Sequence, residues 1–200
     1  MSIARGCGSC IVLVALSLAV ACGSSDQRAL TAALRSYVDA ANRHDLAALG
    51  QMVTEDVAWY LGPDTLRGRQ AVLAPHAFDS GANTVLLVDQ VEVRGDTVEF
   101  DLVEHNDVLD ALGIGELHHY PRFVFRDGLI AEIRARRQPL ELDAFSDSVA
   151  SFMQWLGQHD PTAFARLWPD GRFAYSTEAG TEMPALVLEW RRRDGATPGD

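Results

Sequence analysis

The sequence predicts an α+β fold in which three helices precede an antiparallel sheet and a further, mainly helical segment ends the chain. Three patterns predict it. Apolar residues recur at helical spacing over residues 30–41, apolar and polar residues alternate over residues 97–106, and the hairpin signal Asp127-Gly128 separates two such alternating segments. A length of 200 residues allows one domain with an appendage.

The first two helices are predicted from their apolar stripes. In the first, positions i, i+4, i+7, i+8 and i+11 share one face: Leu30, Leu34, Tyr37, Val38 and Ala41. Asp45 is placed to cap the second helix by accepting hydrogen bonds from its free backbone N–H groups. Residues 57–61 then alternate as in a strand.

A third helix is predicted around residues 70–78, with a distorted second half because Pro75 lacks a backbone N–H. Residues 80–83 are predicted as a loop. Strands follow at 85–94, 97–106, 116–126 and 129–137, with a connection at 107–115. Pro121 indicates a bulge or an edge, and the inward residues of the last strand are Ala131, Ile133 and Ala135.

Residues 139–200 form the additional C-terminal segment. Apolar stripes predict helices near Phe145, after Asp160-Pro161 and around Met183, and residues 172–176 are a candidate strand. The segment is too small to be predicted as an independent domain. We expect it to pack on the preceding domain or to mediate pairing.

The N-terminus predicts export. Arg5 supplies a small positive region, and residues 11–20 are apolar apart from Ser17. A membrane-spanning helix needs about 20 apolar residues, so this shorter run is predicted as part of a signal peptide, residues 1–21. Small residues close the run immediately before Cys22.

Cys22 after small residues resembles the lipobox of bacterial lipoproteins, although Ala19 stands where leucine is usual. The resemblance implies a lipid on Cys22, a tether at residues 22–28 and a membrane-anchored protein of the cell envelope. Cleavage after Ala21, which would release a secreted or periplasmic soluble protein, is the alternative.

Composition limits the partners. The net charge of −11 and the pI near 4.9 argue against nucleic acid, because a phosphate backbone requires a basic face. Cys7 and Cys10 lie in the predicted signal peptide, so with Cys22 lipidated the mature chain would have no cysteine-based site. We expect no cofactor.

A series of short motifs spans the predicted helices and first strand: Tyr37-Val38, Asn42, Asp45-Leu46, Glu55-Asp56-Val57 and Leu66-Arg67-Gly68-Arg69. It resembles the opening of the nuclear transport factor 2-like superfamily, its SnoaL-like branch in particular. The resemblance covers residues 25–137 and implies a SnoaL-like domain at 29–138. Its expected shape is a cone, with helices on the concave face of a curved antiparallel sheet and a pocket at the wide end. Residues 139–200 would pack on it, with the pocket mouth as one location. Such motifs specify fold better than chemistry.

Inner-face positions define a mainly apolar pocket. The ligand-binding candidates are Tyr37, Trp59, Leu61, His76, Phe100, Leu102, Glu104, His119, Phe123 and Ile133. Within an apolar pocket Glu104 could act as an acid or base, and Tyr37 or His119 could donate a hydrogen bond to an enolate or carbonyl oxygen. The alternative is structural: Tyr37 packs, Glu104 reaches water and His76 lies at the surface.

Two known chemistries fit poorly. His118 and His119 are adjacent on a strand and face opposite ways, so they cannot share a metal ion, and no metal site is predicted. The ketosteroid isomerases of the superfamily resemble the chain at Tyr37. Their two catalytic aspartates correspond to Leu61 and to a position near Pro121, so both acids are missing. Arg134 faces outward, away from any epoxide-hydrolase arrangement.

The sequence therefore predicts an exported, lipid-anchored SnoaL-like domain that binds a small, largely apolar molecule in its cone. One alternative is a cyclase- or isomerase-like enzyme with Glu104 as general base and Tyr37 and His119 as hydrogen-bond donors. Another is a non-catalytic interaction or assembly module. The sequence leaves catalysis and a homodimer open.

Overall fold

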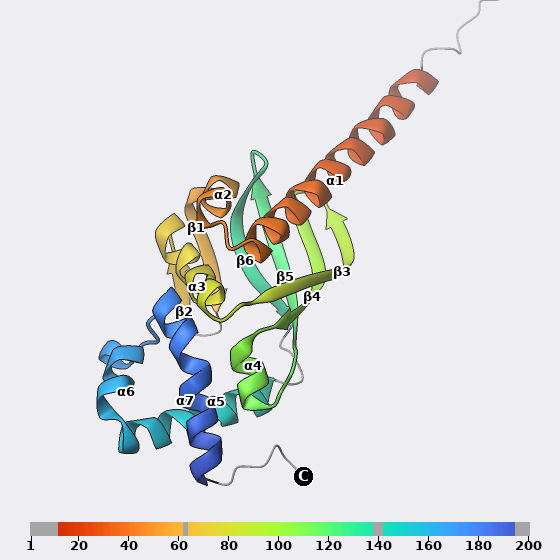
Figure 1. Cartoon of the computed structure of the whole chain (residues 1–200). Helices are drawn as coiled ribbons and strands as arrows, with labels where there is room; N and C mark the ends of the chain where they lie inside the picture. Colours follow the sequence, from red (N-terminus) through yellow and green to blue (C-terminus); the bar gives the residue numbers. More distant parts are fainter. Residues whose placement is uncertain (1–11, 62–63, 138–141, 195–200) are drawn as a thin grey trace, which may run out of the picture.

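Helices, a sheet and further helices follow one another along the chain in a computed structural model that describes residues 12–61, 64–137 and 142–194 (Figure 1). The elements are α1 (Val12–Asn42), α2 (Leu46–Met52), β1 (Val53–Leu61), β2 (Asp64–Arg67), α3 (Arg69–Gly81), β3 (Val85–Arg94), β4 (Thr97–His105), α4 (Asp107–Leu112), β5 (Leu117–Arg126), β6 (Leu129–Arg137), α5 (Leu142–His159), α6 (Pro161–Leu167), the 3-10 turn η1 (Pro169–Gly171) and α7 (Thr177–Asp194). This order confirms the predicted α+β class.

The six strands form one curved sheet in the order β2-β1-β6-β5-β4-β3 (Figure 1). β1 and β6 are parallel, and every other neighbouring pair is antiparallel. The register aligns one row of residues across four strands: Trp59, Ile133, Phe123 and Val98. These side chains all pack in one hydrophobic cluster with the first helices, so the row marks the inner face of the sheet.

The first hydrophobic cluster lies between the inner face of the sheet and helices α1, α2 and α3. Its buried members are Leu34, Tyr37, Val38, Ala40, Ala41, Leu49, Val53, Val57, Val72, Val98, Phe100, Phe123, Phe125, Ile130 and Ile133. The buried stripe of α1 is therefore largely as predicted. Asp45 caps α2, because its Oδ1 accepts a hydrogen bond of 2.9 Å from the backbone N–H of Ala48.

Two of the resembling motifs have a structural role. The Asn42 side chain, at the end of α1, makes two hydrogen bonds with the backbone of Leu86, 2.9 and 2.7 Å long, and so fixes the helix to the edge strand β3. Gly68 has a positive φ of 84° in the turn before α3, which glycine adopts without strain. Arg69 then donates to the backbone oxygen of Val53 at 3.2 Å and pairs with Glu55 at 2.6 Å.

The strands differ from prediction in their irregularities. Pairing between β5 and β6 shifts at Tyr120/Pro121, which confirms a bulge at Pro121, although β5 is an interior strand. It shifts again between Val124 and Phe125, so Ala131 falls at an irregularity and Ile130 is the buried residue there. The sequence did not assign Ile130 to the inner face, and Ala131 is only partly buried. The short strand β2 was missed.

Two helical regions also differ from prediction. α3 continues through Pro75 to Gly81, where the sequence indicated a loop from residue 80. Residues 107–112, predicted within a connection, form α4. Its start is capped by Asn106, and its end is marked by Gly113 in the left-handed conformation with φ of 77°. That cap pair is a sequence signal that went unused.

Helices α5, α6 and α7 form what we call the C-terminal layer. A second hydrophobic cluster joins this layer to α4. Its buried members are Ala82, Val108, Ala111, Leu112, Phe152, Trp155, Leu156, Ala163, Leu167, Trp168, Ala179, Met183, Val187 and Trp190. The strand suggested at residues 172–176 is absent, because no neighbouring strand is there to pair with it. Instead Phe173 and Tyr175 pack edge-on against Phe78 of α3.

α7 crosses α3 at a pair of glycines. A Cβ atom on Gly81 would lie 2.0 Å from the backbone oxygen of Thr177, and one on Gly180 would lie 2.2 Å from the backbone oxygen of Phe78. Neither position has room for a side chain. The two helices therefore meet backbone to backbone at the glycines. The Thr177 hydroxyl also donates to the backbone oxygen of Ala77 at 3.1 Å.

α1 extends toward the N-terminus well beyond the sheet (Figure 1). It includes residues 22–28, for which the sequence predicted a tether, so this stretch is helical here. Within the described part of the chain, no helix combines the length and the apolar composition that a bilayer span requires. The predicted signal peptide lies partly outside the described residues.

Candidate functional site

The ligand-binding candidates lie on or above the inner face of the sheet. Five are buried: Tyr37, His76, Phe100, Phe123 and Ile133. The other five lie near the ends of their strands and are partly exposed: Trp59, Leu61, Leu102, Glu104 and His119. The rings of Tyr37 and Phe100 both meet Phe123 edge-on, with centroids 5.4 and 5.0 Å away. Side chains therefore fill the deep part of the predicted cone, and only its outer part is open to solvent.

A polar pair is enclosed in this filled region. The Tyr37 hydroxyl of α1 lies 2.7 Å from Nε2 of His76 of α3, and the two residues are 3% and 5% exposed. Trp59 lies beside the imidazole, with ring centroids 5.7 Å apart. His76 is thus buried, and the alternative that placed it on the surface was wrong.

Asp79 determines how this pair shares its proton. Its Oδ2 lies 3.3 Å from Nδ1 of His76, outside hydrogen-bond geometry but close enough for a favourable charge contact. The carboxylate favours a proton on Nδ1, so Nε2 is the acceptor and the Tyr37 hydroxyl donates to it. Burial, together with the negative charge of Asp79, raises the pKa of Tyr37 well above its usual range. Tyr37 is therefore a neutral donor whose proton is already used.

A second polar pair lies farther along the same face. Nε2 of His119 on β5 is 2.7 Å from Oε2 of Glu104 on β4, and the two side chains are 32% and 21% exposed. The amide of Asn106 donates to the other carboxylate oxygen at 2.6 Å. Because an ionised carboxylate only accepts, His119 donates from Nε2 and keeps Nδ1 for another partner.

The sequence grouped four polar residues, and the structure divides them into two pairs. Tyr37 meets His76 at the level of Phe123, whereas Glu104 meets His119. Phe123 lies four positions after His119 on β5, roughly 13 Å away at about 3.3 Å per residue. His119 therefore contacts Glu104, whereas Tyr37 contacts His76 instead. The sequence did not single out Asp79 or Asn106, and only their spacing from His76 and Glu104 could have indicated them.

The two adjacent histidines face opposite sides of the sheet, as predicted. His118 contacts Glu116 at 3.0 Å, whereas His119 contacts Glu104 on the inner face. Arg134 also faces outward, with its guanidinium 3.9 Å from the centre of the Tyr60 ring. Among the residues that the structure describes, no group of three or more His, Cys, Asp or Glu side chains is arranged to hold a metal ion.

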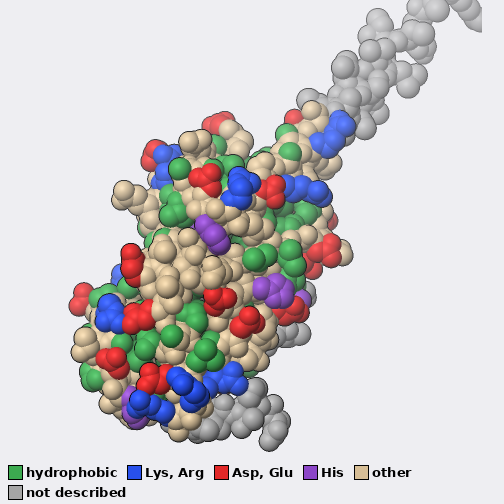
Figure 2. Space-filling model, viewed as in Figure 1, with side chains coloured by type: hydrophobic (Ala, Val, Ile, Leu, Met, Phe, Trp, Pro, Cys, Tyr) green, Lys and Arg blue, Asp and Glu red, His purple; other side chains and the backbone are tan. Residues whose placement is uncertain are grey.

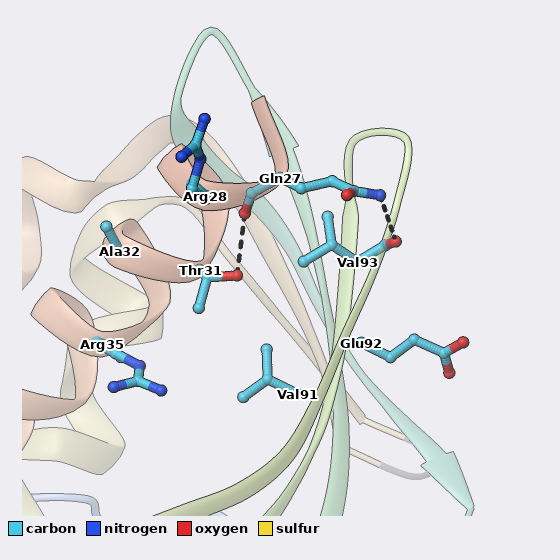
Figure 3. Close-up of a pocket in the computed structure, with 8 residues that line it drawn as sticks. All are labelled: Gln27, Arg28, Thr31, Ala32, Arg35, Val91, Glu92 and Val93. Atoms are coloured by element: carbon cyan, nitrogen blue, oxygen red, sulfur yellow. Dashed lines mark hydrogen bonds between the residues drawn. The ribbon is translucent and has the colours of Figure 1, made fainter. Parts of the chain in front are cut away.

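A separate hollow lies between α1 and the edge strand β3 (Figure 3). It is an open groove of about 730 Å³, lined by Gln27, Arg28, Thr31, Ala32, Arg35, Val91, Glu92 and Val93. Val91 and Val93 point toward the helix, whereas Glu92 points away from it (Figure 3). None of the predicted ligand-binding residues lines this groove.

Acidic and basic side chains are interspersed over the face shown in Figure 2.

Comparison with known proteins finds structural neighbours only. No protein-family profile matches the sequence, and no curated protein sequence matches it. The epoxide hydrolase/cyclase-like enzyme SalBIII is 19% identical, with 59% of this chain and 95% of SalBIII covered at a TM-score of 0.51. Bal32a, from a soil-derived mobile gene cassette, is 15% identical, with 60% and 95% covered at a TM-score of 0.50.

A third solved structure is described as a SnoaL-like polyketide cyclase from Jannaschia sp. CCS1. It is 16% identical, with 60% of this chain and 90% of the neighbour covered at a TM-score of 0.48. At these identities the likeness to SalBIII and Bal32a concerns the fold. Nearly the whole of each neighbour is matched, and the rest of this chain is not.

Proposed function

Because the chain has the nuclear transport factor 2-like fold, we propose that it binds a small, largely apolar molecule against the inner face of its sheet. We propose further that it does so as an exported protein anchored to a membrane through a lipid on Cys22. The observation that carries the first proposal is the Glu104–His119 pair, which is hydrogen-bonded, partly exposed and set in a mainly apolar face. Apolar pockets with a few placed polar groups are typical ligand sites.

The chemistry of the open part of the face limits the ligand. Leu102 lies directly opposite His119 in the register and supplies an apolar surface beside the imidazole. Nδ1 of His119 supplies one polar contact. SalBIII, which shares the fold, is an epoxide hydrolase/cyclase-like enzyme with a role in pyran ring formation in the polyether salinomycin. A small organic molecule with one hydrogen-bonding group fits this surface.

Native mass spectrometry of the mature chain, purified from its own source, tests the binding proposal. We expect a bound mass of a few hundred daltons that is lost on denaturation. Leu102→Asn should abolish it, whereas Leu87→Asn should not, because Leu87 is exposed on β3 and faces the opposite side of the sheet. A ligand retained by Leu102→Asn would contradict the site. An empty dimer would instead favour the assembly alternative.

A second candidate function is proton transfer, favoured by the orientation of the second pair. Glu104 accepts from Nε2 of His119, which leaves Nδ1 as the base and makes Glu104 the group that orients it. With a molecule that the protein converts, His119→Gln should abolish the turnover rate and Glu104→Gln should reduce it strongly. Full activity of both variants would remove the pair from catalysis.

The anchoring proposal has its own test. Radiolabelled palmitate supplied to the source organism should label the wild-type chain and the Cys10→Ser variant, because Cys10 lies in the segment that is removed. Cys22→Ser should lose the label. A labelled Cys22→Ser variant would contradict lipidation at this residue, and an unlabelled wild type would favour cleavage after Ala21.

A further inference from the structure

We propose that the C-terminal layer holds the Glu104–His119 pair in place through α4, so that Arg191 and Asn106 are positioning residues for the site. The consequence for ligand binding rests on the proposed function, whereas the mechanical link does not. α4 lies between the end of the sheet and α7 (Figure 1), and it makes hydrogen bonds to its neighbours at both of its ends.

At the C-terminal end of α4, the link is made by α7. Nη1 of Arg191 donates to the backbone oxygen of Ala111 at 2.8 Å. A Cβ on Gly113 would lie 3.1 Å from the same guanidinium, so glycine there leaves room for the arginine. A positive charge beside the free carbonyls at a helix C-terminus is favourable. Arg191 thus binds the end of α4 from the neighbouring helix.

At the N-terminal end of α4, one buried side chain makes two bonds. Oδ1 of Asn106 accepts from the backbone N–H of Leu109 at 2.8 Å, which caps the helix. Nδ2 of the same amide donates to Oε1 of Glu104 at 2.6 Å. Because the amide is fixed by α4, the position of the helix sets the position of the carboxylate, and the carboxylate in turn holds Nε2 of His119.

α4 cannot hold this position alone. It has six residues, and a helix this short is unstable in water without packing. Val108, Ala111 and Leu112 are buried in the second hydrophobic cluster, with Val187 and Trp190 of α7. The place of α4, and with it that of Asn106, therefore depends on the C-terminal layer. This gives the additional segment of the chain a role at the site.

Chemical modification of histidines in the mature chain tests the link. Diethylpyrocarbonate attacks free imidazole nitrogens, and peptide mass spectrometry resolves each histidine. Arg191→Ala should raise the modification rate of His119 about fivefold or more. Loss of a hydrogen bond made by a charged group should increase, by about that factor, the fraction of molecules in which His119 has left Glu104. His118, on the outer face, and buried His76 should react at unchanged rates. Unchanged His76 would show that the fold is intact.

Two further variants separate positioning from stability. Arg193→Ala is the matched control, because Arg193 is exposed on the same helix and pairs with Glu189 instead of α4. It should leave His119 unchanged. Asn106→Ser keeps a good helix cap but removes the amide that holds Glu104, so His119 should again react faster while the melting temperature falls little.

Equal His119 rates in the wild type, Arg191→Ala and Asn106→Ser would overturn the proposal. If Arg191→Ala unfolds, exposing His76 as well, Asn106→Ser alone decides. The outcome is independent of the ligand: an empty pocket in native mass spectrometry would remove the proposed function and leave these rates as expected. Conversely, a bound ligand with unchanged rates would keep the function and remove the link.

Discussion

The two hydrophobic clusters of this chain differ in what they enclose. The first, between α1–α3 and the sheet, surrounds the hydrogen-bonded Tyr37–His76 pair. The second, between α4 and the C-terminal layer, encloses the indole nitrogen of Trp155, which has no hydrogen-bond partner among the described residues. Enclosing a polar group costs desolvation energy, which the hydrogen bond between Tyr37 and His76 offsets in the first cluster. Both hydrogen-bonded pairs of titratable side chains described above lie on the sheet side of the molecule, so a functional site is expected there, with the C-terminal layer as its support.

α3 is the element that joins the two clusters. Val72 packs in the first, Phe78 packs against the second, and Gly81 meets α7. The joint is made by backbone contact between glycines, with no space for a methyl group. The contribution of each region to the free energy of unfolding can therefore be tested, first at this joint and then inside the first cluster.

The largest effect is expected at the crossing. Gly180→Ala would place a Cβ 2.2 Å from the Phe78 backbone oxygen, so the helices must separate and the free energy of unfolding should fall by about 3 kcal/mol. Gly157→Ala is the control, because a Cβ there meets only Phe164 at 3.8 Å and alanine favours a helix by about 1 kcal/mol. Urea denaturation measures both. Equal stability of the two variants would show that the crossing is loose.

A smaller effect is expected within the first cluster. Tyr37→Phe keeps the ring but leaves Nε2 of His76 buried without its donor, which should lower the free energy of unfolding by about 2 kcal/mol. Tyr60→Phe should cost much less, because the Tyr60 ring stacks under Arg134 on the outer face and phenylalanine keeps that contact. A Tyr37→Phe variant as stable as wild type would mean that the pair contributes nothing to the fold.

The sequence predicted the fold well where a single face is buried. The stripe of α1, the cap at Asp45 and the alternation of β4 all follow from local periodicity, and the structure has each of them. Periodicity failed at irregularities. The bulge at Ala131 shifts the inward residue of β6, and residues 172–176 alternate without a strand to pair with. Both depend on distant neighbours that a local pattern does not contain.

The sequence placed the candidate residues on the inner face, and it did not predict which of them contact one another. Each inner-face residue could be assigned from strand parity, including Glu104 and His119. The contacts between the polar groups could not be assigned, because the tertiary packing of α1, α3 and the sheet decides that Tyr37 reaches His76 and that Glu104 reaches His119. Asp79 lies near the end of α3 and Asn106 caps α4. In a sequence, residues at such positions look like ordinary surface or turn residues.

The smallest expected effect concerns alkaline pH. The pKa of a tyrosine in an unfolded chain is about 10, and the pKa of Tyr37 in the folded chain lies well above that value. Folding therefore favours the neutral phenol. The stabilisation is complete below pH 10 and is lost as pH rises above it, since the unfolded state then releases the proton first. From pH 9 to 11 the wild type should lose about 1.4 kcal/mol more than Tyr37→Phe, measured by urea denaturation. Parallel losses would mean that the Tyr37 hydroxyl reaches water, and that the deep part of the cone is open after all.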